Sequence, residues 1–106
     1  MRKELAGIGI MRRNEALDIL HEHREKIAGF GVKALSIFGS VARDEAGPDS
    51  DVDVLVEFKE PVGLFHLIRL QIFLEGLLNR KVDLTTIGGL RERMREQVLG
   101  EAIRAA

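Results

Sequence analysis

The chain has 106 residues, a formal net charge of −1 at pH 7 and no cysteine. This length suits one domain with a modest hydrophobic core. The near-neutral charge argues against general nucleic-acid binding, which normally requires a basic excess, and the lack of cysteine excludes disulfides and thiol chemistry. Charged residues interrupt the most apolar stretch, 62–78, and no secretory signal is recognisable. We therefore expect a cytoplasmic protein without a membrane span.

The order of hydrophobic patterns predicts the organisation of the chain. Residues 1–11 are weakly patterned and are interpreted as an N-terminal extension, with Met11 as an alternative start, whereas residues 12–106 are predicted to form a single domain. Helical and strand periodicities alternate in this domain, which predicts an α+β (mixed α/β) fold with a small mixed sheet flanked by helices. The predicted elements are a helix over 14–28, strands over 33–38 and 51–58, a helix over 64–78, a strand over 81–85 and a helix over 90–104.

The predicted helix over residues 64–78 is apolar around most of its circumference. Such a helix must be buried on more than one side. Two interpretations are open, namely association with a partner or a second copy, and packing under the last helix.

Two aspartates occupy alternate positions in a valine-rich run. Asp51 and Asp53 alternate with valines at positions 52, 54 and 56, and this period-two pattern predicts a strand. Alternate strand residues share a face, and their Cα atoms lie about 6.6 Å apart at about 3.3 Å per residue. Carboxylates at this spacing suit Mg²⁺, which often binds through one or two carboxylates together with substrate phosphates.

A small-residue turn follows the predicted strand over 33–38. Gly39 permits a sharp turn and a close approach of phosphate to the main chain. Ser40 offers a hydroxyl and is predicted to be the N-cap of a short helix, whose N-terminus would attract an anion. Arg43 lies one turn further along. It is either within reach of a phosphate or a solvated surface residue.

Asp83 is a candidate third acid. It lies between Val82 and Leu84 in the predicted strand over 81–85 and faces away from both. If this strand adjoins the one over 51–58, three acids would form a cradle for two Mg²⁺ ions about 3.5–4 Å apart. Alternatively, Asp83 would deprotonate an attacking hydroxyl.

These motifs resemble those of the minimal nucleotidyltransferases, within the DNA polymerase β-like nucleotidyltransferase superfamily. Members carry a hydrophobic strand, Gly-Ser, a spacer and then Asp-x-Asp, which here is GSVARDEAGPDSDVD over residues 39–53. The later segments LNRKVDLTT and VLGEAIRA also resemble the small antitoxin-type members. The resemblance extends from about Arg12 to the C-terminus and implies the nucleotidyltransferase-superfamily fold.

The resemblance also implies a role for each matched residue. Asp51 and Asp53 would bind Mg²⁺ and Asp83 would complete the site, while Gly39 and Ser40 would hold the triphosphate. The implied reaction is attack of an acceptor hydroxyl on the α-phosphorus of ATP, with release of pyrophosphate. In the antitoxin group the acceptor is a tyrosine of a HEPN-domain toxin, which makes such a toxin the expected partner and this chain its antitoxin.

The sequence leaves open the effect of two acidic residues and two other functions. Asp44 and Glu45 follow Arg43 where many relatives have Ala-Arg-Gly. These acids would either weaken nucleotide binding or point outward. A non-catalytic module that neutralises its partner by binding alone is therefore the alternative function. A third interpretation is a small-molecule nucleotidyltransferase that forms a homo-oligomer, with the acceptor at the dimer interface.

Overall fold

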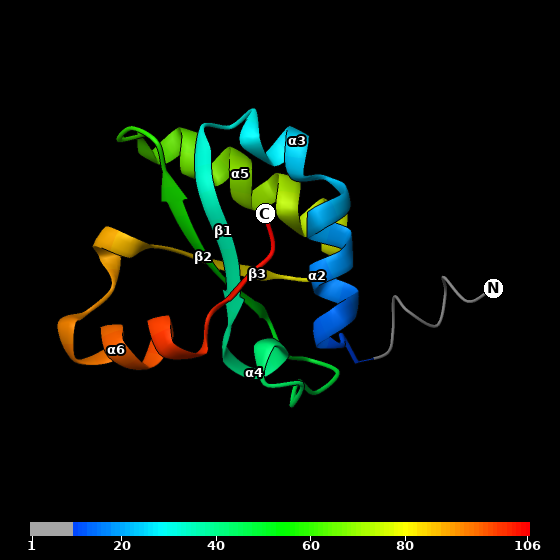
Figure 1. Cartoon of the computed structure of the whole chain (residues 1–106). Helices are drawn as coiled ribbons and strands as arrows, with labels where there is room; N and C mark the ends of the chain where they lie inside the picture. Colours follow the sequence, from blue (N-terminus) through cyan, green and yellow to red (C-terminus); the bar gives the residue numbers. More distant parts are fainter. Residues whose placement is uncertain (1–9) are drawn as a thin grey trace.

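The structure is a computed structural model that describes residues 10–106, so most of the extension predicted over residues 1–11 lies outside the described residues. Helices and strands alternate along the chain (Figure 1), which confirms the predicted α+β class. The helices are α2 (Arg13–Glu22), α3 (Arg24–Ala28), α4 (Gly39–Ala42), α5 (Leu64–Leu78) and α6 (Glu92–Glu101), with the 3-10 helix η1 (Ile87–Gly89). The strands are β1 (Val32–Phe38), β2 (Val52–Phe58), β3 (Val82–Thr86) and β4 (Ile103–Arg104).

One sheet in the order β3-β2-β1-β4 connects all the described strands. β1 pairs antiparallel with both β2 and β4, whereas β2 and β3 are parallel. A parallel pair requires a long crossover, and α5 supplies it between β2 and β3. The sheet is therefore mixed, and the strand that carries Asp53 lies directly beside the strand that carries Asp83.

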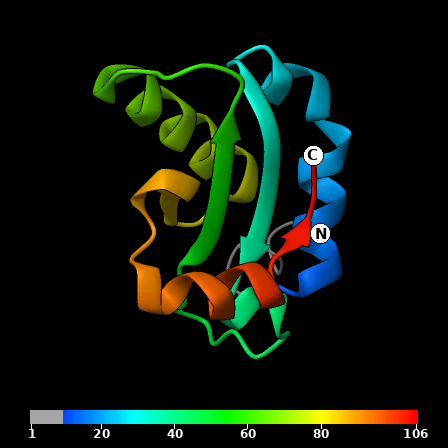
Figure 2. The same ribbon diagram turned by 60° about the vertical axis from the view of Figure 1, so that its left-hand side comes forward.

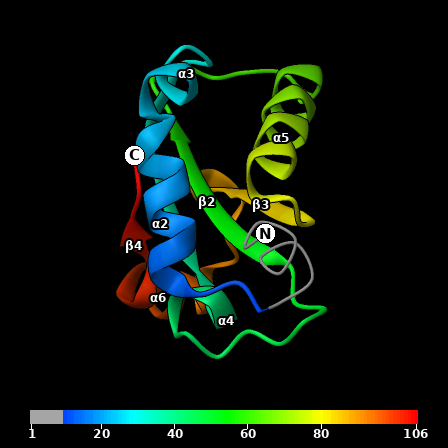
Figure 3. The same ribbon diagram turned by 90° about the vertical axis from the view of Figure 1, so that its right-hand side faces the viewer.

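The core lies between the sheet and the two long helices of one face. Figure 3 shows α2 and α5 in front of the sheet. Val54 of β2 and Leu35 of β1 are fully buried against this layer, as are Leu70 and Leu74 of α5. On the other side, α6 crosses the end of the sheet where β1 ends and β2 begins (Figure 2). This arrangement buries one set of alternate strand residues and leaves the intervening set, which includes Asp53, on the side of α6.

Two predicted helices differ from the structure. The helix predicted over 14–28 is interrupted at His23, which separates α2 from α3. The helix predicted over 90–104 is shorter, because Ala102 has extended φ/ψ angles of −67° and 135°. Ile103 then pairs with Ile37 as part of β4. The free edge of β1 satisfies the backbone groups of this terminal segment, which a pattern within one segment does not reveal.

The α5 helix packs on the sheet through only part of its apolar surface. Leu70, Leu74 and Leu78 are buried, whereas Leu64, Phe65 and Ile72 are 69%, 78% and 62% exposed. Since α6 lies on the other side of the sheet (Figure 2), it does not cover these side chains. Within residues 10–106, no helix is long and apolar enough to cross a membrane.

Candidate active site

The acids of β2 and β3 face each other across the parallel pair. Asp53 is the register partner of Asp83, and neighbouring strands are separated by about 4.8 Å. Asp53 is half-buried and Asp83 is exposed, while Asp51 is exposed immediately before β2. The adjacency of β2 and β3, which the sequence left as a condition, is thus present. It brings Asp53 and Asp83, two of the three predicted acids, together on one face.

Side chains of α5 hold β3 in this position. Gln71 Nε2 donates a hydrogen bond to the carbonyl oxygen of Val82 at 2.9 Å, and the Val82 N–H donates to Glu75 Oε2 at 3.0 Å. Both contacts involve the residue directly before Asp83. Sequence reasoning missed this role, and the only signal was that Gln71 and Glu75 are polar residues in a mostly apolar helix.

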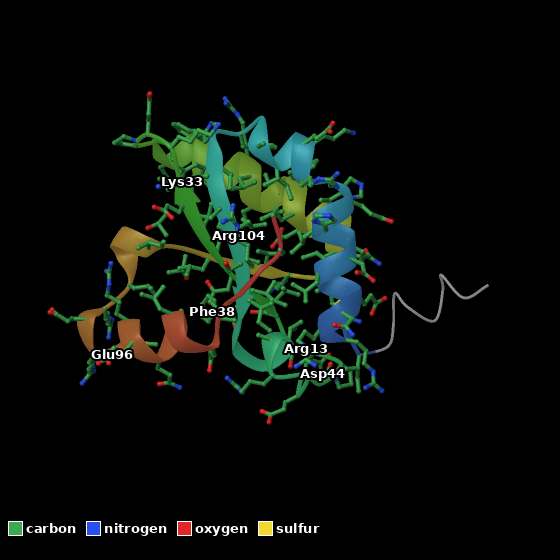
Figure 4. All side chains as sticks on the ribbon, viewed as in Figure 1. Arg13, Lys33, Phe38, Asp44, Glu96 and Arg104 are labelled. Atoms are coloured by element: carbon green, nitrogen blue, oxygen red, sulfur yellow. The ribbon has the colours of Figure 1, made fainter. Side chains whose placement is uncertain are left out.

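The turn at Gly39 packs directly against Asp53. Phe38, the last residue of β1 (Figure 4), is the register partner of Asp53. Gly39 follows with a positive φ of 72°. A Cβ atom at Gly39 would lie 2.1 Å from Asp53 Oδ2, so any other residue would displace this carboxylate. Glycine is therefore required twice here, by the backbone conformation and by contact with the carboxylate.

The short helix α4 begins two residues earlier than predicted. Its N-cap is Phe38 and no side chain caps it, so the prediction of Ser40 as the N-cap is wrong. Ser40 is half-buried in the first turn, and Arg43 is the C-cap, whose N–H donates to the carbonyl oxygen of Gly39 at 3.1 Å. The structure therefore places the three residues predicted to bind nucleotide within one turn.

A fourth acid, Glu101, enters this turn from the end of α6. Its Oε1 accepts hydrogen bonds from the Gly39 N–H at 2.9 Å and from Arg43 Nη1 at 3.1 Å. Arg43 also donates through Nε to Glu45 Oε1 at 3.0 Å. The bond to Glu45 is the main cause of a raised Arg43 pKa, with further contributions from Glu101. Sequence reasoning missed Glu101 because the last helix was predicted to continue to residue 104, whereas α6 ends at Glu101.

Negative charge accumulates around Asp53. Burial raises the pKa of its carboxyl group, and the charges of Asp83 and Asp51 raise it further, whereas Arg43 lowers it. Carboxylate oxygens are the donors that Mg²⁺ prefers, and a cation on this face would relieve the repulsion. The donor chemistry thus fits a divalent cation. In the part of the chain that the structure describes, however, no three acidic or histidine side chains converge as a ready metal site.

Asp44 points away from the turn at Gly39. Its φ is 61°, in the left-handed region that glycine, asparagine and aspartate favour, which explains why glycine also suits this position. Its Oδ1 accepts a hydrogen bond from the backbone N–H of Arg13 at 2.9 Å, and Figure 4 shows the two residues together at the foot of α2. Of the two placements left open by the sequence, the structure therefore has the outward one.

Comparisons with known proteins show the family of this chain. The family model described as a nucleotidyltransferase domain matches residues 15–105. The chain belongs to this family. Protein adenylyltransferase MntA of Thermococcus cleftensis is 40% identical over 90 residues, which cover 84% of this chain and 91% of MntA. As a member of the nucleotidyltransferase family, the chain is an enzyme that transfers a nucleotidyl group.

Two solved structures share the fold of this nucleotidyltransferase. One, described as a minimal nucleotidyltransferase, is 47% identical, with a TM-score of 0.69 over 82% of this chain and 93% of that chain. The other is a Shewanella oneidensis MNT antitoxin complex with a tri-AMPylated HEPN toxin. It is 16% identical, with a TM-score of 0.63 over 85% of this chain and 71% of that chain. At this low identity, the second likeness shows the fold alone.

Proposed function

We propose that this nucleotidyltransferase transfers AMP from ATP, with Mg²⁺, to a tyrosine hydroxyl of a partner HEPN-domain toxin, and so acts as its antitoxin. The protein from Thermococcus cleftensis is named an adenylyltransferase. The HEPN toxin in the Shewanella complex is described as AMPylated. These names supply the donor and the partner of the proposal, while the transfer chemistry rests on the site itself.

One observation carries the proposal, namely the contact of Gly39 with Asp53. The turn predicted to hold phosphate lies against the acid predicted to hold metal. A Cβ atom added at Gly39 would lie only 2.1 Å from Asp53 Oδ2. Metal-assisted phosphoryl chemistry needs this proximity, because Asp53 would hold a cation that neutralises the charge of a phosphate at the turn. A pair of acids on a solvated strand face would need no such contact.

The reaction proposed for this site forms one bond and breaks another. The oxygen of the acceptor hydroxyl bonds to the α-phosphorus of ATP, and the bond from that phosphorus to the oxygen bridging to the β-phosphorus breaks, which releases pyrophosphate. The N–H of Gly39, the hydroxyl of Ser40 and the guanidinium of Arg43 would bind the phosphates. Asp51, Asp53 and Asp83 would hold Mg²⁺, which supplies charge neutralisation when bound. In the alternative in which Asp83 does not hold the metal, its carboxylate would accept the hydroxyl proton.

The direct test is label transfer to a defined acceptor. The pure protein, α-labelled ATP, Mg²⁺ and the protein encoded by the neighbouring gene are incubated together, and the acceptor is analysed by intact mass. We expect an acceptor heavier by one or more AMP groups, and no addition with the Asp51→Asn/Asp53→Asn control. An unmodified acceptor in a confirmed complex would contradict the proposal and favour inhibition by binding alone.

The exposed surface of α5 is the candidate contact for the partner. Phe65 and Ile72 are large apolar side chains with 78% and 62% exposure, and surfaces of this kind mark protein interfaces. We expect Phe65→Ser/Ile72→Ser to weaken the complex while ATP binding and the unfolding midpoint stay near the wild-type values. Met94→Ser, which replaces an apolar residue of 47% exposure on α6, is the matched control. Equal affinities of all three proteins for the partner would exclude α5 from the interface.

A further inference from the structure

The two groups best placed to bind a phosphate both donate to one carboxylate. Glu101 Oε1 accepts from the Gly39 N–H at 2.9 Å and from Arg43 Nη1 at 3.1 Å, and its Oε2 lies 3.3 Å from the same Nη1. The contact joins the last residue of α6 to the turn after β1, where Figure 2 shows α6 crossing the end of the sheet. Hence an anionic group already binds the donors of the phosphate turn.

A carboxylate and a phosphate compete for such donors. Both are oxyanions that accept charge-assisted hydrogen bonds from a guanidinium and from backbone N–H groups. The Gly39 N–H has a single hydrogen and is directed at Glu101 Oε1. A phosphate oxygen bound there requires that Glu101 leave, and a triphosphate beside a retained Glu101 would also face like-charge repulsion.

The backbone around Glu101 allows its side chain to move alone. Ala102 has an extended conformation, and Ile103 pairs with Ile37 in the sheet. The Ala105 N–H donates to the carbonyl oxygen of Leu35 at 2.8 Å. These contacts anchor the chain directly after Glu101, while the Glu101 side chain keeps 23% of its surface exposed. A rotamer change at Glu101 therefore frees the turn without displacing β4.

We propose that Glu101 occupies the position of a nucleotide phosphate in the free enzyme and is displaced when the triphosphate binds. This inference rests on the proposed function, because it takes the turn at Gly39 as the phosphate site. It makes Glu101 a specificity-determining residue: a ligand must carry enough phosphate charge to replace a carboxylate. A neutral nucleoside leaves the Glu101 contacts in place.

The test measures binding of inorganic tripolyphosphate by calorimetry, without Mg²⁺ or turnover. Glu101→Gln keeps the size of the side chain and removes the charge that holds Arg43. Because an ion pair of this exposure contributes modestly, we expect the variant to bind tripolyphosphate about five- to tenfold more tightly. Adenosine affinity should be the same for both proteins.

Glu45→Gln is the matched control for charge alone. Glu45 binds the same guanidinium at 3.0 Å, but its side chain does not bond the Gly39 N–H. We expect a smaller gain in tripolyphosphate affinity for Glu45→Gln than for Glu101→Gln. Equal gains would overturn the competition model, since general charge relief would then explain both.

Glu101→Asp is a second variant that keeps the charge. The shorter side chain cannot span both donors from the same backbone position, so we expect tighter tripolyphosphate binding than in the wild type. Weaker binding to both Glu101 variants would instead show that Glu101 organises the turn for its ligand, and would overturn the inference alone. Failure of the wild type and every variant to bind tripolyphosphate, both without and with Mg²⁺, would overturn the proposed function as well.

Discussion

Substitution of Gly39 by alanine tests the central contact of the site. The matched substitution is Gly31→Ala. Both glycines have positive φ angles, 72° at Gly39 and 82° at Gly31. A Cβ at Gly39 would lie 2.1 Å from Asp53 Oδ2, whereas a Cβ at Gly31 has no neighbour within 4 Å. The difference between the two variants therefore isolates the contact from the backbone conformation.

The structure sets the expected loss for each variant. A left-handed residue with a Cβ costs about 1–2 kcal/mol, and this term applies to both glycines. At Gly39 the carboxylate of Asp53 must also be displaced, and overpacking of this kind costs about 1–3 kcal/mol more. We expect losses in the free energy of unfolding of about 1–2 kcal/mol for Gly31→Ala and about 2–5 kcal/mol for Gly39→Ala.

Urea denaturation of the two single variants and of Gly39→Ala in an Asp53→Ala background completes the test. Without Oδ2 the nearest Asp53 atom to the added methyl group is Cβ, at 3.3 Å. The excess cost at Gly39 should therefore fall to near that of Gly31→Ala, as a coupling energy between residues 39 and 53. Equal costs for both glycines in the native background, or an unchanged cost at Gly39 without the carboxylate, would refute the reasoning.

Three further predictions concern the surroundings of the site. The raised pKa of Asp53 means that its negative charge opposes folding, so the metal-free Asp53→Asn variant should be more stable than the wild type at pH 7. A calorimetric pH series should show this gain disappear below about pH 4, where the aspartate is protonated in the folded and the unfolded state. A variant less stable than the wild type at pH 7 would contradict this expectation. Asp44→Ala loses the bond to Arg13 and strains the backbone, so its urea midpoint should fall below that of Asp44→Gly, which loses only the bond; the reverse order would contradict the strain at residue 44. Glu75→Ala removes the acceptor of the Val82 N–H and should slow AMP transfer more than it weakens tripolyphosphate binding, with partial rescue by Glu75→Gln; equal effects on both would show general damage to the fold.

Local patterns predicted the elements that fold by their own periodicity. The valine alternation identified β2, and the apolar run between Gly63 and Asn79 identified α5, which has these two residues as its caps. The patterns also predicted that Asp53 and Asp83 would be neighbours if their strands adjoined. The register that makes them direct partners depends on the crossover through α5 and became visible only in the structure.

Contacts between distant segments set the limit of prediction. Glu101 lies 62 positions beyond Gly39 in the chain, and their hydrogen bond depends on where α6 crosses the sheet. The break at Ala102 and the pairing of Ile103 with Ile37 likewise arise from an available strand edge. Sequence periodicity reports burial within one segment, so it contains no information on which donor a carboxylate at the end of a helix will meet.

Departures from ordinary stability rules gather at one end of the sheet. Gly39 carries a positive φ beside a carboxylate, Asp53 is half-buried next to Asp83, and the pKa of Asp53 is raised by burial and by neighbouring acids. A sequence selected for stability alone would replace the half-buried Asp53, because burial and the neighbouring acids disfavour its charged form in the folded state. The proposed function would place a cation and a phosphate here, and Glu101 binds the donors of the Gly39 turn in the free enzyme. Among the groups that affect the pKa of Asp53, only Arg43 compensates the negative charge, so a cation bound near Asp53 would have a favourable electrostatic contribution.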